Sequence, residues 1–253
     1  MNDQPFKYKL VLAYDGSRYS GWQVQPNATS IQTLVQAALS KTLNQKTFVV
    51  GSGRTDSGVH ARGQVAHFTQ SAEIDTGKVL YSLNGLLPAD IRALELAPVP
   101  SDFHARYSAK GKIYRYHLRT SSLRDPFRRL YTYQLPCPID EEILGKAARH
   151  FVGTHDFSSF ANEAHRGSAS RKPVKTLARL DILQEDGGLV LEFEGDGFLY
   201  KMVRNIVGAL LDCARGKLDE RKIPEIFEGK DRRLAPPTAP PHGLFLVSVK
   251  YEV

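Results

Sequence analysis

The chain has 253 residues, of which 42% are hydrophobic and 24% are charged, and its net charge is +7. These fractions are typical of a soluble globular protein with one large domain or two ordinary ones. The polar start, Met1 to Pro5, argues against a secretory signal, and no apolar run is long enough to span a membrane. Cys137 and Cys213 lie far apart without metal-ligand spacing, which predicts reduced, buried side chains in a cytoplasmic protein.

The positive charge is concentrated in the middle of the chain. Residues 107–180 contain 14 Lys and Arg against 6 Asp and Glu, whereas residues 181–253 contain 10 against 13. Such an excess suggests a polyanionic partner bound through its phosphates, although a generic basic surface explains the charge equally well.

The first half of the chain predicts a strand, a helix, two strands, a second helix and a further strand. Thr29 and Gln32 have the spacing of a capping box, which predicts that the first helix begins at Thr29. Pro88 ends the second helix, and Pro98-Val99-Pro100 ends the last strand. The predicted elements cover residues 8–14, 29–39, 47–50, 64–69, 76–86 and 91–96.

The second half can be read in the same order, with one more short helix. Asp140 is a candidate N-cap, and Asp186-Gly187-Gly188 predicts the turn of a hairpin. The predicted elements cover residues 112–119, 140–151, 177–183, 189–194, 203–211, 223–227 and 244–251.

This repeated order predicts an α/β (α+β) fold with two tandem ferredoxin-like, or RRM-like, units. Antiparallel or mixed sheets would carry the helices and be joined around a basic cleft. We expect an N-terminal α/β domain over 1–106, which carries the loop of Asp56, and a C-terminal α/β domain over 107–253, which carries Tyr114 and the helix of Arg204.

The most informative segment runs from Gly51 to Phe68. Its glycine-punctuated loop places Asp56 beside Arg54, between the strands predicted over residues 47–50 and 64–69. A turn between strands gives a reactive group a rigid mount and an open approach. Asp56 could be a turn residue, a structural partner of an arginine, or a nucleophile or base.

Two other kinds of site are disfavoured near this loop. Gly51 and Gly53 are followed by a strand and lack a Gly-Lys-Ser/Thr ending, so a phosphate loop is rejected. His60 and His67 have no Cys or acidic partner at ligand spacing, which favours ordinary polar or surface histidines over a metal site.

Two segments of the second half carry further candidates. In residues 112–119, Tyr114 and Tyr116 share one face of the predicted strand and Arg115 shares the other with further basic residues. This pattern fits a half-buried strand with a solvated basic face, and equally a platform for base stacking. Arg204 is predicted early in a helix, where the helix dipole mildly disfavours a cation. The penalty is small enough for a solvated side chain, but an anionic partner such as Asp56 explains the position better.

The sequence resembles the TruA-type pseudouridine synthase family over nearly its whole length. The loop around Asp56 resembles the family's Arg-Thr-Asp-x-Gly-Val-His motif, and Tyr114 looks like its base-stacking tyrosine. The four similar segments are residues 54–61, 112–116, 197–204 and 240–246.

The resemblance implies two α/β domains around a basic cleft, a homodimer, and no metal or organic cofactor. It implies isomerisation of uridine to pseudouridine at positions 38–40 in the anticodon stem-loop of tRNA, whose phosphate backbone the protein would bind. Asp56 would be the catalytic nucleophile, Tyr114 would stack on the target base, Arg204 would pair with Asp56, and Arg54 would help to extrude the uridine.

The sequence leaves several alternatives open. It does not say whether Asp56 attacks C1′ of the ribose or the uracil ring. An RNA-binding or tRNA-folding module without catalysis would use the same basic residues but would gain nothing from Asp56. Hydrolysis of a nucleoside bond is a third, weaker possibility.

Overall fold

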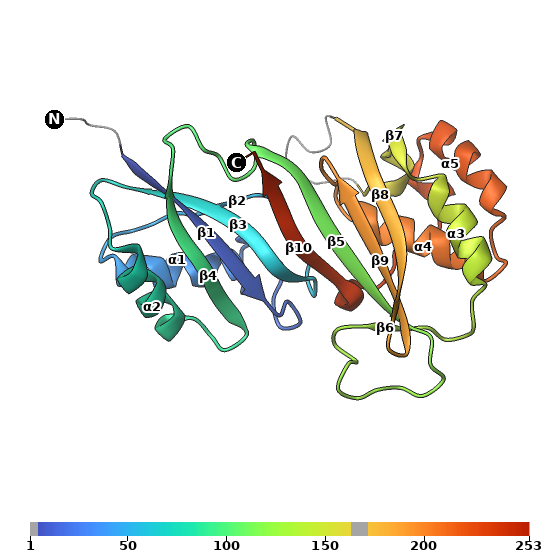
Figure 1. The fold of residues 1–253 in the computed structure, drawn as a ribbon, viewed down its shortest axis with the longest axis horizontal. Coiled ribbons are helices and arrows are strands. Elements are labelled where there is room, and N and C mark those ends of the chain that lie inside the picture. Colours follow the sequence, from blue (N-terminus) through green and yellow to red (C-terminus); the bar gives the residue numbers. More distant parts are fainter. Residues whose placement is uncertain (1–4, 163–171, 253) are drawn as a thin grey trace. The chain divides into compact units, whose positions relative to one another are not determined.

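The computed structural model describes residues 5–162 and 172–252, so the polar start over residues 1–4 lies outside the described part. The chain forms two compact units (Figure 1). One comprises the residues up to Lys110 together with those from Phe245 onwards, and the other comprises Gly111–Leu244. Residues 107–110 and 245–252 therefore group with the N-terminal unit, and the expected domains over 1–106 and 107–253 stay a prediction.

The first unit is a mixed sheet with two helices that contact one another. Its strands lie in the order β4-β1-β3-β10; β1 is antiparallel to β3 and β4, and β10 is parallel to β3. This arrangement, with β2 also on β3, is the ferredoxin-like order that the sequence predicts. The elements are β1 (Phe6–Tyr14), α1 (Ile31–Thr42), β2 (Val50–Gly51), β3 (His60–Gln70), α2 (Thr76–Leu86), β4 (Ile91–Val99) and β10 (Leu244–Tyr251).

The start of α1 differs from the prediction. Ser30, in an extended conformation, is the N-cap, and its Oγ accepts a hydrogen bond from the backbone N of Thr33. The side chain of Gln32 is buried instead of closing a capping box with Thr29, because its Nε2 donates to the carbonyl of Val49 and its Oε1 accepts from another loop.

The predicted strand over residues 47–50 is reduced to β2 for a related reason. The backbone N of Thr47 donates to Ser40 Oγ, and that of Val49 donates to Gln36 Oε1, so side chains of α1 take up these backbone donors. At the other end of the unit, β4 continues through Pro98. A proline is tolerated there because β4 terminates the sheet of this unit.

The second unit is an antiparallel sheet with the strand order β5-β9-β8-β7, and β6 pairs in parallel with β5. Asp140 caps α3 as predicted, and α3 contacts both α4 and β8. The hairpin of β8 and β9 turns at Asp186-Gly187, where Gly187 has a φ of +73°. The elements are β5 (Ala109–Arg119), β6 (Tyr133–Gln134), α3 (Glu141–Arg149), β7 (Gly153–Asp156), β8 (Val174–Glu185), β9 (Gly188–Gly195), α4 (Met202–Ala214) and α5 (Ile223–Gly229).

The two cysteines differ from one another. Cys213 on α4 is buried, as expected, and burial raises the pKa of its thiol to about 12. The expectation of a buried Cys137 is wrong, because it is exposed in the segment between β6 and α3. Within the described residues, no helix is both long and apolar enough to cross a membrane.

Candidate functional site

The loop that carries Asp56 lies between β2 and β3 in the first unit. Arg54 is exposed and Asp56 is half-buried, so both charged side chains reach the surface of the same loop. Their neighbour Thr55 is buried between them. The loop therefore turns its uncharged residue inward and its two charged residues outward.

Hydrogen bonds from distant parts of the unit hold this loop on both sides of Asp56. The backbone N of Trp22 donates to the carbonyl of Thr55 at 3.1 Å, and Thr55 Oγ1 lies 2.8 Å from the hydroxyl of Tyr14. On the other side, Ser57 Oγ donates to the carbonyl of Tyr19 at 3.1 Å. Anchors on both neighbours restrict the positions that the Asp56 carboxylate can adopt.

A buried glutamine on β3 completes the support. Gln64 Oε1 accepts a hydrogen bond from Ser52 Oγ at 2.8 Å, and its Nε2 donates to the carbonyl of Gly53 at 3.1 Å. Burial raises the pKa of the Tyr14 hydroxyl to about 12, although hydrogen bonds with Thr55 and Gln64 oppose the shift. Tyr14 is therefore neutral at neutral pH, and these inner partners of the loop are uncharged.

Two glycines allow the backbone of a neighbouring loop to approach. A Cβ on Gly21 would lie closer than 3.0 Å to the carbonyl oxygen of Thr55, and a Cβ on Gly16 would lie equally close to that of Val59. Gly21 also has a φ of +83°, which disfavours any larger residue. No sequence motif indicates the roles of Tyr14, Gln64 or these glycines, because the residues that they contact lie far away in the chain.

Both histidines of this segment are buried polar side chains and not surface ones, and Asp15 Oδ1 lies 3.1 Å from His60 Nδ1. His60 is buried, its Nδ1 accepts from the backbone N of Gly16 at 3.1 Å, and its ring stacks on Phe245 at 4.5 Å. His67 Nδ1 accepts from the backbone N of Ala105 at 3.2 Å. Over residues 5–162 and 172–252, no group of three or more His, Cys, Asp and Glu side chains is arranged to hold a metal ion.

Tyr114 and Arg204 belong to the second unit. Tyr114 on β5 is only 7% exposed and meets the ring of Phe198 edge to face at 5.0 Å. Arg204 lies in the first turn of α4, as the sequence predicts, and its Nε donates to the carbonyl of Ala239 at 2.8 Å. The backbone N of Ala239 donates back to the carbonyl of Arg204, so two hydrogen bonds join the helix to this loop.

Tyr116 supports the same loop. Its hydroxyl donates to the carbonyl of Pro240 at 2.8 Å. Burial raises the pKa of this hydroxyl, and the positive charge of Arg204 opposes the shift. The proline-rich run from Ala235 to Pro241 was the only signal in the sequence for this support.

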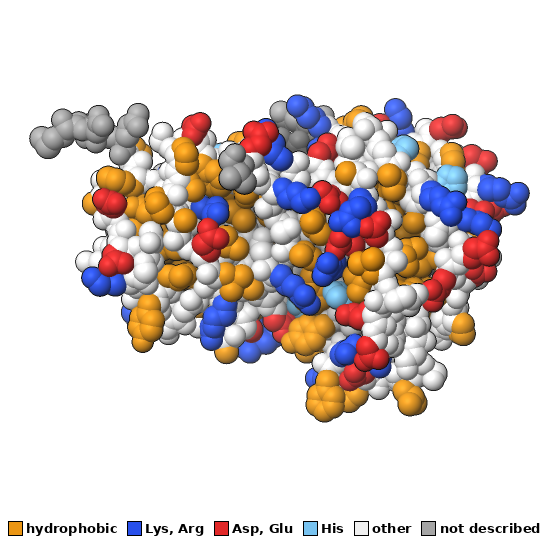
Figure 2. Space-filling view, in the orientation of Figure 1, with side chains coloured by type: hydrophobic (Ala, Val, Ile, Leu, Met, Phe, Trp, Pro, Cys, Tyr) orange, Lys and Arg blue, Asp and Glu red, His pale blue; other side chains and the backbone are white. Residues whose placement is uncertain are grey.

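The predicted basic face of β5 is largely neutralised within the second unit. Arg115 Nε and Arg179 Nη2 both bind the buried carboxylate of Glu192, at 2.5 and 2.6 Å, and Arg179 also pairs with Asp181. Blue and red side chains accordingly lie side by side over this sheet (Figure 2). This face fits an internal ion-pair network better than a row of cations that bind phosphate.

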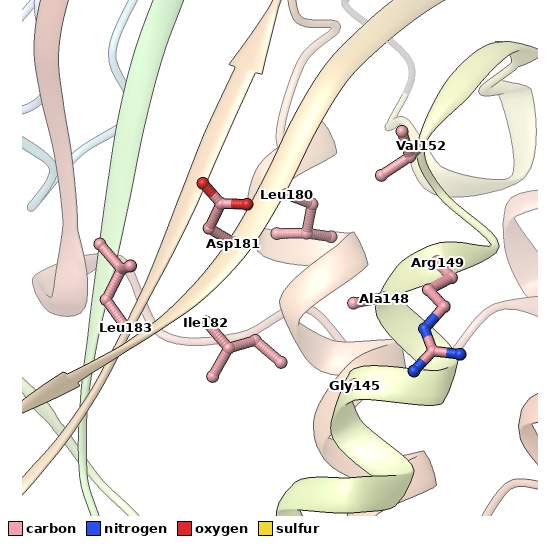
Figure 3. A pocket seen from close by; sticks show the side chains of 8 residues that line it. All are labelled: Gly145, Ala148, Arg149, Val152, Leu180, Asp181, Ile182 and Leu183. Atoms are coloured by element: carbon pink, nitrogen blue, oxygen red, sulfur yellow. The ribbon is translucent and has the colours of Figure 1, made fainter.

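A groove of about 430 Å³ lies between α3 and β8. Leu180 and Ile182 point towards α3, Asp181 lies on the other side of the strand, and Arg149 borders the groove (Figure 3). Apart from Arg149 and Asp181 the residues that line this groove are apolar, and the Asp181 carboxylate is paired with Arg179. The loop of Asp56 remains the better candidate.

A half-buried carboxylate on a firmly held loop of an α+β chain defines a candidate enzyme. Comparison with known proteins gives the family. The sequence profile described as tRNA pseudouridine synthase matches residues 10–108 and 147–252. The chain belongs to the tRNA pseudouridine synthase family, which is a family of isomerases.

Three relatives illustrate the similarity. The chain is 58% identical to tRNA pseudouridine synthase A 1 of Protochlamydia amoebophila, over 97% of this chain and 96% of the relative. It is 45% identical to tRNA pseudouridine synthase A of Chlamydia muridarum, over 97% and 92%. It is 43% identical to tRNA pseudouridine synthase A of Acetivibrio thermocellus, over 96% and 98%.

A likeness to a solved structure is remote. A chain in a structure described as "Crystal Structure of a Cbf5-Nop10-Gar1 Complex" aligns with 80% of this chain and 54% of its own length, at 13% identity and a TM-score of 0.33.

Proposed function

We propose that this protein isomerises uridine to pseudouridine at positions 38–40 in the anticodon stem-loop of tRNA. The observation that carries the proposal is the half-buried Asp56 on a loop fixed by uncharged partners on both sides. Three relatives that cover nearly the whole chain bear names that specify tRNA as substrate, which supports the choice of RNA. A tRNA substrate would place the activity in the cytoplasm.

The proposed reaction breaks the C1′–N1 glycosidic bond and forms a bond between C1′ and C5 of the same uracil. The proton on C5 leaves to solvent and N1 gains a proton, so the atoms balance without an oxidant or reductant. Asp56 would supply the one nucleophile, at C1′ or at the uracil ring, while the base turns. The chemistry therefore calls for neither a metal nor an organic cofactor.

The other residues have proposed roles of binding and positioning. Tyr114 would hold the loose base by stacking, and its hydroxyl would handle the proton at C5. Arg204 would pair with Asp56 and keep the carboxylate ionised once water is excluded. Arg54, exposed on the Asp56 loop, would take the place of the extruded uridine. A homodimer, measurable by sedimentation, would let one protomer grip the tRNA while its partner holds the target.

The decisive experiment measures tritium released to water from tRNA that carries tritium at uridine C5, together with tRNA affinity. We expect Asp56→Asn to lower kcat by about 10⁴-fold or more, because it removes the nucleophile, while the Kd for tRNA changes little. Glu73→Gln, an exposed carboxylate of the same unit, is the matched control and should behave as wild type.

Two results would contradict the proposal. If the wild type releases no tritium from several tRNAs, the protein is not a synthase of this kind. If Asp56→Asn loses tRNA affinity and turnover together, Asp56 has a structural role and a binding module becomes the better account. Nucleotide-resolution mapping of pseudouridine in the treated tRNA tests positions 38–40.

A further inference from the structure

A cluster of aromatic rings in the first unit lies just before β5, in a segment that the proposed reaction does not use. The ring of His104 lies 4.3 Å from that of Tyr107 and 4.6 Å from that of His67, and Phe103 lies 5.1 Å from Tyr251. Tyr107 is nevertheless 74% exposed. The cluster thus holds the Tyr107 ring through its contact with His104 and leaves most of the ring in solvent.

Tyr107 borders a hollow of about 270 Å³. Since a water molecule occupies roughly 30 Å³ of the liquid, the hollow can admit a planar ring. Its walls are Phe103, Tyr107, Ser108, Lys110, Tyr251 and Glu252. Three of these six residues are aromatic, so the hollow favours a flat ligand that can stack.

The charges around the ring favour a polyanion. The guanidinium of Arg106 lies 5.8 Å from the centre of the Tyr107 ring, and Lys7 Nζ donates to the carbonyl of Phe103 at 2.9 Å. Lys110 lines the hollow, where it pairs with Glu252 at 2.8 Å. Residues 103–112 include three Lys and Arg but no Asp or Glu.

His104 adds a flat ring without adding charge. Burial and the nearby charges of Lys7 and Arg106 lower the pKa of its imidazole below the usual value. The ring is therefore neutral at neutral pH and can back the tyrosine by stacking. An aromatic ring flanked by cations is the arrangement by which proteins bind unpaired nucleotides.

We propose that Tyr107 stacks on an unpaired nucleobase of the bound tRNA other than the target uridine, with Arg106 beside a flanking phosphate. The proposal rests on the proposed function for the identity of the ligand as tRNA. It differs from the role given to Tyr114, which is only 7% exposed whereas Tyr107 is 74% exposed. A protein partner is disfavoured because its apolar surface would have to bury the cations of this segment.

The test compares the affinity of three variants for unmodified tRNA by filter binding over a range of salt concentrations. We expect Tyr107→Ala to raise Kd by about 5- to 100-fold, as the loss of one stacked base would, and by the same factor at every salt concentration. Tyr107→Phe keeps the ring and should bind within about twofold of wild type. Tyr81→Ala, which removes an 85% exposed tyrosine from α2 of the same unit, should bind as wild type does.

Three outcomes would overturn the inference: an unchanged Kd for Tyr107→Ala, an equal loss in Tyr107→Phe, or dissociation of an oligomer by Tyr107→Ala in sedimentation, which would make this face a contact between protein copies. Tritium release by the wild type separates the two proposals. Turnover with an unchanged Kd for Tyr107→Ala rejects only the stacking site. The wild type could bind tRNA without releasing tritium while Tyr107→Ala alone loses affinity. That result rejects only the proposed reaction.

Discussion

The two units hold a charged residue in place by the same kind of contact, a glycine pressed against a backbone carbonyl. In the first unit Gly21 approaches the carbonyl of Thr55, the residue before Asp56. In the second unit Gly208 on α4 approaches the carbonyl of Pro237, in the loop that brings Ala239 to Arg204. At both places a Cβ would come closer than 3.0 Å to the oxygen.

The conformation of the two glycines differs. Gly21 has a φ of +83° in a loop, where any side chain is strained whatever the space around it. Gly208 lies inside a helix, where alanine is intrinsically preferred by about 1 kcal/mol. A side chain at Gly21, next to the loop of Asp56, is therefore disfavoured both by a clash and by the backbone conformation. A side chain at Gly208, next to the loop of Arg204, is disfavoured by a clash alone.

Among the tests of this comparison, the largest effect is expected from breaking the contact between Gly21 and Thr55. Gly21→Ala should lower the free energy of unfolding by about 2–5 kcal/mol, since it combines a clash with an unfavourable φ. Because the Thr55 carbonyl must move, the Asp56 carboxylate should move with it, and kcat should fall by about 100-fold. Denaturant unfolding and tritium release measure the two effects.

Gly85→Ala on α2 is the matched control, since nothing lies within 4 Å of the added Cβ. This helical substitution should raise the free energy of unfolding by about 0.5–1 kcal/mol and leave kcat unchanged. A Gly21→Ala variant that turns over like wild type would show that the contact with Thr55 does not position Asp56.

The two units should also differ in their response to acid. Burial, with the charges of His104 and Lys7, lowers the pKa of His67 in the first unit to about 4 from the ordinary 6.5. Burial opposes ionisation of Glu192 in the second unit, yet its bonds with Arg115 and Arg179 prevail and lower the pKa of its carboxyl below the ordinary 4.5. Both folded pKa values lie below the unfolded ones, so both contributions to stability are lost as pH falls.

The two contributions are lost over different ranges of pH. The contribution of His67 is complete above pH 6.5 and is lost towards pH 4, and it should reduce the free energy of unfolding by about 2 kcal/mol at pH 5. The contribution of Glu192 is lost only below about pH 4.5. Urea unfolding followed by the fluorescence of Trp22, the single tryptophan, reports on the first unit. His67→Gln should abolish the loss at pH 5; a loss of equal size in this variant would assign it to other groups.

Helical periodicity and turn chemistry made much of the fold predictable. The bounds of α2 and of β10 match the prediction, and Asp140 and the Asp186-Gly187 turn act as expected. The placement of Asp56 on a loop between strands was also predictable, because glycine and polar residues interrupt two apolar runs. Each of these signals is local, because it lies in the residues of a single element and of its two ends.

The supports of the candidate site were not predictable, because they join residues far apart in the chain. No local pattern indicates that the backbone of Trp22 meets Thr55, or that Tyr116 meets Pro240. The ion pairing on the basic face of β5 was not predictable for the same reason, since Glu192, the partner of Arg115, lies on β9. Periodicity identifies the face on which a side chain lies but not the residue that it meets across the sheet.

The smallest expected effect sharpens the comparison between the two glycine contacts. Gly208→Ala gains about 1 kcal/mol of helix propensity but overpacks the helix against the Pro237 carbonyl at a cost of about 1–3 kcal/mol, so a net loss of up to about 2 kcal/mol is expected. Gly145→Ala on α3 places a Cβ with nothing within 4 Å. It therefore gains helix propensity without overpacking and should stabilise the protein.

The kinetic effects should rank in the same order. Gly208→Ala displaces the loop that fixes Arg204 through Ala239, so kcat should fall by about tenfold, less than in Gly21→Ala, because a flexible guanidinium can follow its partner better than a loop carboxylate can. Unfolding and tritium release measured on the four alanine variants give both rankings. A larger loss of kcat in Gly208→Ala than in Gly21→Ala would mean that the position of Arg204, rather than that of Asp56, limits the reaction.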